Sequence, residues 1–164
     1  MPEAYIVEAV RTAGGKRGGR LAGVHPVDLA AVTLDAVMER TGLDAKAVDD
    51  VVMGCVSQGG EQAMQVGRNA VLAAKRLGEG VPAVTIDRQC GSSQQAIQFA
   101  AQAVMSGTQD VVIAAGVESM SRVPMASDGG AIAVDPSITF DQYFVPQGIG
   151  ADTIATEYGF SRDQ

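Results

Sequence analysis

The sequence predicts an α/β fold built on a parallel or mostly parallel sheet. Two observations lead to this prediction. Apolar segments of strand length alternate along the chain with longer segments whose apolar residues have helical spacing. The strand segments are also continuously apolar, as in parallel sheets that helices cover on both faces. A chain of 164 residues is long enough to bury such a core.

Four strands and three helices are expected in the first part of the chain. Residues 4–12 mix β-branched and apolar residues and run into a glycine-rich loop, which predicts a first strand. Residues 26–41 predict a helix, with Pro26 near its start and Gly42 just past its end. The other expected elements are strands at 50–57, 82–87 and 110–116, a helix at 69–78 closed by Gly78, and a helix at 91–106 followed by Gly107.

The composition changes after Val117. Five of the seven aromatic residues lie between 140 and 160, and residues 119–150 show little periodicity. We therefore expect an α/β region over 1–118 and a loop-rich region over 119–164. Residues 159–164 are typical of a helix start without a helix body, which favours a chain that is cut short.

Charge and composition exclude several classes of function. A net charge of -7 opposes binding to nucleic acid, which requires a basic face. The basic residues at 16, 17 and 20 lie among glycines and are interpreted as a solvated loop. No apolar run reaches the roughly 18 residues of a membrane span, and the N-terminus lacks the features of a secretory signal. We expect a cytoplasmic protein whose two cysteines stay thiols, with no metal site.

Cys90 comes directly before the helix expected at 91–106. That helix is apolar nearly all round, so it is expected to be buried. Its first turn carries unpaired N–H groups and a partial positive charge, which favour a thiolate and can stabilise an oxyanion. Three interpretations stay open on this basis: a nucleophile, an anion-binding turn formed by residues 90–93, and a structural thiol. Cys55 lies within an apolar strand and is interpreted as core.

The segments DRQCGSSQQAI and DVVIAAGVESMSRVPM together resemble the thiolase family, the acetyl-CoA acetyltransferases and 3-ketoacyl-CoA thiolases. The resemblance continues through VRTAGGKRGG, QGGEQAMQVGRNA and QGIGADTIATEYGFSRDQ, and so covers essentially the whole chain. It implies the first half of a layered α/β fold. In that fold a loop domain, begun here at 119, covers coenzyme A, and one further strand returns to the sheet afterwards.

The resemblance also implies the chemistry. Cys90 matches the nucleophile that accepts the acyl group, and its backbone N–H helps to stabilise the oxyanion. Coenzyme A is a co-substrate, and no cofactor is implied. Gln147 and Gly148 align with a segment that contacts the pantetheine arm. Gln147 replaces a methionine of some biosynthetic members, which favours a degradative or broader specificity. Thiolases are usually dimers or tetramers, so a homodimer or homotetramer is expected.

Other catalytic groups of the family lie in a C-terminal half that this sequence does not contain. They are a histidine base, a second cysteine in a Cys-x-Gly turn and an asparagine. His25 does not match the histidine turn and is interpreted as a helix entry or loop residue, and Cys55 lacks the Cys-x-Gly pattern. We expect these 164 residues alone to be inactive. The alternatives are a non-catalytic fragment and a ketoacyl synthase, although the GVESMS turn argues against the latter. Acyl chain length and reaction direction stay open.

Overall fold

The computed structural model describes residues 2–130, 137 and 145–163. The chain divides into two compact units, one up to Asp128 and one from Gly129 onward, and each is described by itself. The boundary predicted between residues 118 and 119 concerned the inserted loop domain, and it stays a prediction.

Three parallel strands form the sheet of the first unit. They are β1 (Asp50–Gly54), β2 (Ala83–Ile86) and β3 (Val112–Gly116), arranged in the order β2-β1-β3. In this register the last residue of β1, Gly54, lies between Ile86 and Gly116. The predicted α/β class with a parallel sheet is confirmed.

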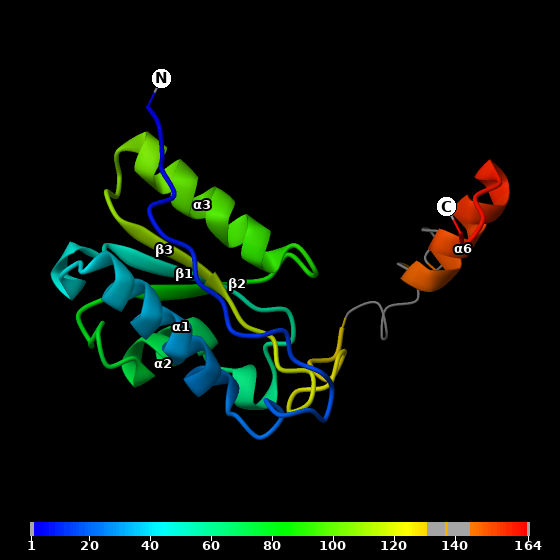
Figure 1. Ribbon diagram of the computed structural model, residues 1–164, viewed down its shortest axis with the longest axis horizontal. Coiled ribbons are helices and arrows are strands. Elements are labelled where there is room, and N and C mark those ends of the chain that lie inside the picture. Colours follow the sequence, from blue (N-terminus) through cyan, green and yellow to red (C-terminus); the bar gives the residue numbers. More distant parts are fainter. Residues whose placement is uncertain (1, 131–136, 138–144, 164) are drawn as a thin grey trace. The chain divides into compact units, whose positions relative to one another are not determined.

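Helices cover both faces of this sheet. Figure 1 shows α1 (Pro26–Thr41) and α2 (Val66–Ala73) on one side and α3 (Ser92–Ser106) on the other. Two short 3-10 helices, Ala45–Ala47 and Gly60–Gln62, lie in the connections. The core joins α1, β1 and α2, and its fully buried side chains include Leu34, Val51, Met53, Val66 and Val71.

The ends of α1 follow from local chemistry. His25 is the N-cap, and its Nδ1 accepts a hydrogen bond from the Val27 N–H at 3.2 Å. Pro26 occupies the first turn, where a missing N–H costs nothing. Gly42 ends the helix with a left-handed φ of 65°. The predicted helix and the interpretation of His25 as a helix-entry residue are confirmed.

The strand predicted over residues 4–12 is wrong. The structure assigns no strand there, and Tyr5, Ile6 and Val7 are 77%, 81% and 81% exposed. The composition of this segment favours a strand, but a strand needs a partner for its backbone groups. Among the described residues none pairs with it, and β3 pairs only with β1. The segment therefore lies beside the sheet without joining it.

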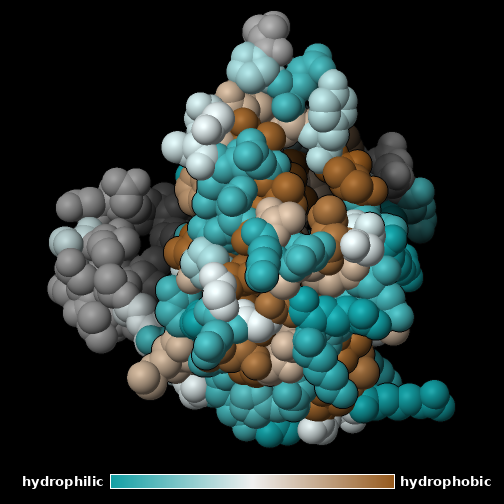
Figure 2. All heavy atoms as spheres, turned by 90° about the vertical axis from the view of Figure 1, so that its left-hand side faces the viewer, coloured by the Kyte–Doolittle hydropathy of each residue, from teal (hydrophilic) through white to brown (hydrophobic). Residues whose placement is uncertain are grey.

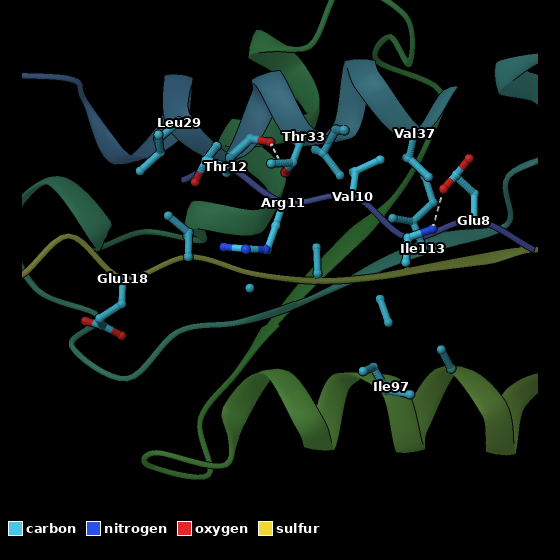
Figure 3. Close-up of a pocket in the computed structure, with 18 of the residues that line it drawn as sticks. Glu8, Val10, Arg11, Thr12, Leu29, Thr33, Val37, Ile97, Ile113 and Glu118 are labelled. Atoms are coloured by element: carbon cyan, nitrogen blue, oxygen red, sulfur yellow. Dashed lines mark hydrogen bonds between the residues drawn. The ribbon is translucent and has the colours of Figure 1, made fainter. Parts of the chain in front are cut away.

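A groove of about 1480 Å³ separates this segment from the free edge of β3. In Figure 3, Arg11 points into it from the N-terminal segment, Ile97 faces it from α3, and Glu118 lies near one end. Figure 2, which shows the side at the left of Figure 1, has hydrophobic residues at the surface around a hollow in its upper part. The strand that the resemblance places after the loop domain stays a prediction.

The prediction that α3 is buried is wrong for the described chain. Only Ser92, Gln95, Ala96 and Ala100 are buried, on the face toward the sheet. Elsewhere on the helix Ile97, Phe99 and Met105 are 51%, 44% and 43% exposed, and Ile97 lies toward the groove beside β3. The extent of α3 and its end at Gly107, with φ of 74°, agree with the prediction.

Smaller differences concern element ends. The helix predicted at 69–78 begins three residues earlier, at Val66, and ends at Ala73. Gly78, with φ of 90°, lies in the following turn instead of closing the helix. The strand predicted at 50–57 ends at Gly54, where the chain leaves the sheet.

The second unit contains α6 (Gln147–Tyr158), which ends at Gly159 with φ of 72°. Its residues lie in a region for which the sequence predicted loops. Tyr158, its last residue, stacks with Phe160, with ring centroids 6.1 Å apart. Within the described ranges, no helix has both the length and the hydropathy needed to cross a membrane.

Candidate active site

Cys90 lies in a tight turn between β2 and α3, and it is exposed. Gln89, directly before it, has a left-handed φ of 46°, which is uncommon for a residue other than glycine. Two backbone hydrogen bonds close the turn: Gly91 N–H donates to the Arg88 carbonyl at 3.0 Å, and Ser92 N–H donates to the Gln89 carbonyl at 2.9 Å. The thiol is therefore carried on a constrained turn at the carboxyl end of the sheet, where parallel α/β folds bind ligands.

Two side chains reinforce this turn. The Asp87 carboxylate accepts a hydrogen bond from the Gln89 N–H at 2.6 Å. The hydroxyl of Ser92, which is only 4% exposed, accepts from the Arg88 N–H at 2.9 Å and donates to the Gln89 carbonyl at 2.6 Å. The same hydroxyl lies 3.3 Å from the Asp87 carboxylate. Asp87 and Ser92, one before and one after the left-handed Gln89, thus both take part in holding it.

These bonds disfavour the interpretation of residues 90–93 as an anion-binding turn. The N–H groups of Gly91 and Ser92 both donate to carbonyls within the turn. The Ser92 hydroxyl is buried and committed to the same turn. Two donors that an anion would need are therefore already paired, whereas the thiol of Cys90 reaches the surface.

Two glycines at strand ends make room for the first turn of α3. A Cβ added to Gly54 would lie 2.5 Å from the Ser92 backbone carbon. One added to Gly116 would lie 1.9 Å from the Ser93 hydroxyl oxygen. Since real contacts of this kind are far longer, only glycine at both positions allows the helix start to rest on the strand ends. The position of Cys90 above the sheet depends on this close approach.

A second network joins the loop after β1 to the turn after β3. Gln62 is fully buried; its amide nitrogen donates to Glu118 at 3.0 Å and to the Ser57 carbonyl at 2.8 Å, and its oxygen accepts from the Ser119 N–H at 2.7 Å. Glu118 also accepts from the N–H groups of Val56 and Ser57 at 2.7 and 3.2 Å. This network fixes the loops that border the carboxyl ends of β1 and β3.

The other cysteine is unsuited to proton transfer. Cys55 is 1% exposed, and burial raises the pKa of its thiol to about 12, with the nearby Glu118 carboxylate adding to the shift. The interpretation of Cys55 as a core residue is confirmed.

His25, the only histidine in the sequence, is engaged with other partners. Its Nε2 lies 3.7 Å from Glu61, which forms a paired contact with Arg122. The hydrogen bond from Arg122 holds the pKa of Glu61 below its usual value. His25 therefore serves the start of α1 and this surface ion pair.

The structure places the two predicted pantetheine-contacting residues, Gln147 and Gly148, in the first turn of α6. They belong to the second unit, whereas Cys90 belongs to the first. Among the residues that the structure describes, no group of three or more histidine, cysteine or acidic residues is arranged to hold a metal ion.

Several residues around the site were not anticipated from the sequence. Asp87 two positions before Gln89 is the pattern of an Asx turn, which could have suggested its role. Glycines as the last residues of two neighbouring strands are also a recognisable signal of close approach. Gln62 and Glu118 gave no such signal, since 56 residues separate them.

Comparison with known proteins shows the family of the chain. The family model for the thiolase N-terminal domain matches residues 4–164. The steroid 3-ketoacyl-CoA thiolase FadA6 of Mycobacterium tuberculosis is 58% identical over 127 residues, which cover 77% of this chain and 31% of that protein. A beta-ketoadipyl-CoA thiolase of Escherichia coli is 47% identical over 125 residues, 76% of this chain and 31% of its own. The 3-ketoacyl-CoA thiolase of Bacillus subtilis is 37% identical over 164 residues, 99% of this chain and 42% of its own.

A parallel sheet with an exposed cysteine before a covering helix, together with these matches, defines the class: an acyltransferase family. The chain belongs to the thiolase family and corresponds to its N-terminal domain. It spans less than half the length of the relatives it matches. The family match also favours the thiolase interpretation over a ketoacyl synthase.

Proposed function

We propose that this chain supplies the nucleophile of an acyl-CoA thiolase and that Cys90 carries the acyl group. The observation that supports this most is the placement of Cys90: an exposed thiol on a constrained turn directly before α3. The 15-residue helix α3 begins two residues after Cys90, and a helix N-terminus provides the polar environment that an oxyanion requires.

The proposed reaction has two half-reactions. The Cys90 thiolate attacks the 3-keto carbon of a 3-ketoacyl-CoA, and the C2–C3 bond breaks. Its electron pair stays on C2, which takes up a proton, so acetyl-CoA leaves and a shortened acyl group remains on Cys90 as a thioester. The thiol of a second coenzyme A then attacks this thioester, gives up its proton and releases the shortened acyl-CoA. The synthetic direction follows the same steps in reverse.

Proton transfer in these steps requires a base and a second reactive thiol, and neither His25 nor Cys55 is suited to these roles. Among the described residues, His25 caps α1 and contacts Glu61, and the buried Cys55 holds its proton up to high pH. We propose that the complete enzyme joins this chain to a C-terminal half that supplies the base and a second thiol. On this proposal the 164 residues alone cannot catalyse the reaction. By themselves they are the non-catalytic fragment named above as an alternative.

The substrate class is a 3-ketoacyl-CoA thioester, and coenzyme A is the co-substrate, with no cofactor. The relatives are named for steroid, ketoadipyl and general 3-ketoacyl substrates, so the acyl chain is best found with a panel of these. Gln147 and Gly148 are proposed to contact the pantetheine arm. We further propose a cytoplasmic homodimer or homotetramer that binds neither nucleic acid, given the net charge of -7, nor membranes.

The test is thiolysis of acetoacetyl-CoA, 3-oxoadipyl-CoA and a longer 3-ketoacyl-CoA by the complete enzyme. Cys90→Ala is expected to abolish cleavage, whereas the matched variant Cys55→Ala retains it. Residues 1–164 alone are expected to cleave none of the substrates. Retained turnover in Cys90→Ala would refute the assigned role, and an active 1–164 chain would refute the need for a second half.

A further inference from the structure

The turn that carries Cys90 contains a left-handed residue that is not glycine. Gln89 has φ of 46°. This conformation costs free energy, and it persists only where the surrounding contacts hold it. The backbone direction at Gln89 sets where the Cα–Cβ bond of the next residue points. A relaxed Gln89 would therefore move the thiol of Cys90.

Gln89 is held by one side chain on each side of the turn, in addition to the Ser92 N–H that donates to its carbonyl at 2.9 Å. Asp87 accepts from the Gln89 N–H at 2.6 Å, and its second oxygen accepts from the Gln89 side-chain amide at 3.2 Å. From the other side, the buried Ser92 hydroxyl donates to the Gln89 carbonyl at 2.6 Å. The backbone N–H and carbonyl of Gln89 are thus both bound by polar side chains.

We propose that Asp87 is a positioning residue for Cys90 and that it acts together with Ser92 by holding Gln89 in its left-handed conformation. Asp87 is exposed and lies outside the core, so its removal leaves the packing of the sheet intact. This inference rests on the proposed role of Cys90 as the nucleophile.

The consequence is a separation of turnover from substrate binding. A misdirected thiolate attacks the 3-keto carbon less often, although the acyl-CoA binds as before, so kcat falls while KM is little changed. Loss of about 1 Å of alignment costs on the order of 100-fold in rate. We expect Asp87→Ala and Ser92→Ala each to lower kcat by about 10- to 100-fold. Asp87→Asn keeps an oxygen acceptor for the Gln89 N–H and is expected to stay within about 3-fold.

The experiment measures kcat, KM and the rate of acyl-enzyme formation in the complete enzyme with acetoacetyl-CoA. Asp44→Ala is the matched control: the Asp44 carboxylate also accepts from an N–H two residues ahead, at Lys46 and 3.0 Å, but it lies before β1 at the other end of the sheet. It is expected to leave kcat unchanged. Circular dichroism melting identifies any variant that fails to fold, and Ser92→Ala then replaces Asp87→Ala in the comparison.

The outcomes separate the two proposals. If Cys90→Ala is inactive and Asp87→Ala turns over like the parent enzyme, the positioning role is overturned and the proposed function stands. An Asp87→Asn variant as impaired as Asp87→Ala overturns it as well, because the amide oxygen preserves the hydrogen bond. Turnover in Cys90→Ala would instead overturn the proposed function.

Discussion

Gly54 and Gly116 lie side by side as the last residues of β1 and β3, and both face the first turn of α3. A methyl group on Gly54 would lie 2.5 Å from backbone atoms of Ser92 and Ser93. One on Gly116 would lie 2.9 Å from the Ser93 Cβ. The first turn of α3, and with it the Cys90 turn, can therefore pack this close to the sheet only because neither position carries a side chain.

Gly54→Ala is expected to destabilise the enzyme by about 3 kcal/mol, because backbone cannot move aside as a flexible side chain can. Gly116→Ala is expected to cost somewhat less, since its nearest contact is the Ser93 hydroxyl. Urea denaturation measures both. Gly23→Ala is the control, with nothing within 4 Å of the added carbon. Equal stability of all three variants would mean that α3 does not rest on the strand ends.

Replacing Gln62 with leucine tests the network between the two loops. Gln62→Leu leaves the buried Ser119 N–H without its acceptor and removes one of the three donors to Glu118, so a loss of about 2–4 kcal/mol is expected. Gln98→Leu, on the exposed face of α3, is the matched control and is expected to change the free energy of unfolding by less than about 0.5 kcal/mol. A neutral Gln62→Leu would contradict the structural role of the network.

The two cysteines are expected to differ in reactivity. Iodoacetamide should label Cys90 in the native enzyme and Cys55 only after unfolding, because Cys90 is exposed and Cys55 is 1% exposed with a pKa of about 12. Peptide mass mapping after timed alkylation gives both rates. Equal native rates would count against the assignment of Cys90 as the accessible thiolate.

The raised pKa of Cys55 has a consequence for stability. A thiol with an ordinary pKa of 9.0 in the unfolded chain and about 12 in the fold stabilises the fold fully below pH 9. This contribution is lost as pH rises from about 9 to about 12. Denaturation at pH 8 and 10.5 should therefore show a smaller loss of stability in Cys55→Ala than in the parent enzyme. An equal loss of stability in Cys55→Ala and in the parent enzyme would contradict the raised pKa of Cys55.

Asp49 provides the corresponding test at acid pH. Its carboxylate accepts from the N–H groups of Val111 and Asp110, at 3.0 and 2.7 Å, and these bonds lower its pKa. The stabilisation is present above the ordinary pKa of aspartate and is lost as pH falls through the lowered value. Asp49→Asn should therefore flatten the dependence of stability on pH below about 4, relative to an Asp28→Asn control. An unchanged slope would contradict this role.

Elements that depend on local spacing could be predicted from the sequence, whereas those that depend on distant partners could not. The extents of α1 and α3 follow from apolar periodicity and from glycines that end helices, and both were predicted closely. Residues 4–12 have the composition of a strand, yet they form none, because no described segment pairs with them. Apolar residues of α3 such as Phe99 and Met105 are exposed for a similar reason, since their burial depends on segments distant in the sequence.

The candidate site was predicted in the same uneven way. Cys90 was singled out from the residues around it, which left three interpretations open, and only the resemblance to thiolases implied that it is the nucleophile. The contacts that hold it were not, because they depend on the left-handed Gln89 and on the approach of Ser92 and Ser93 to strand ends. Periodicity contains no information about either.

The most direct test of the central claim is the mass of the acyl-enzyme. The complete enzyme is mixed with acetyl-CoA, quenched in acid within milliseconds and digested, and the peptides that contain Cys90 and Cys55 are weighed. The account predicts one acetyl group on the Cys90 peptide, none on the Cys55 peptide, and release of the label when coenzyme A is added. An acetyl group on any other residue, or an unmodified Cys90 peptide in an enzyme that turns over, would contradict it.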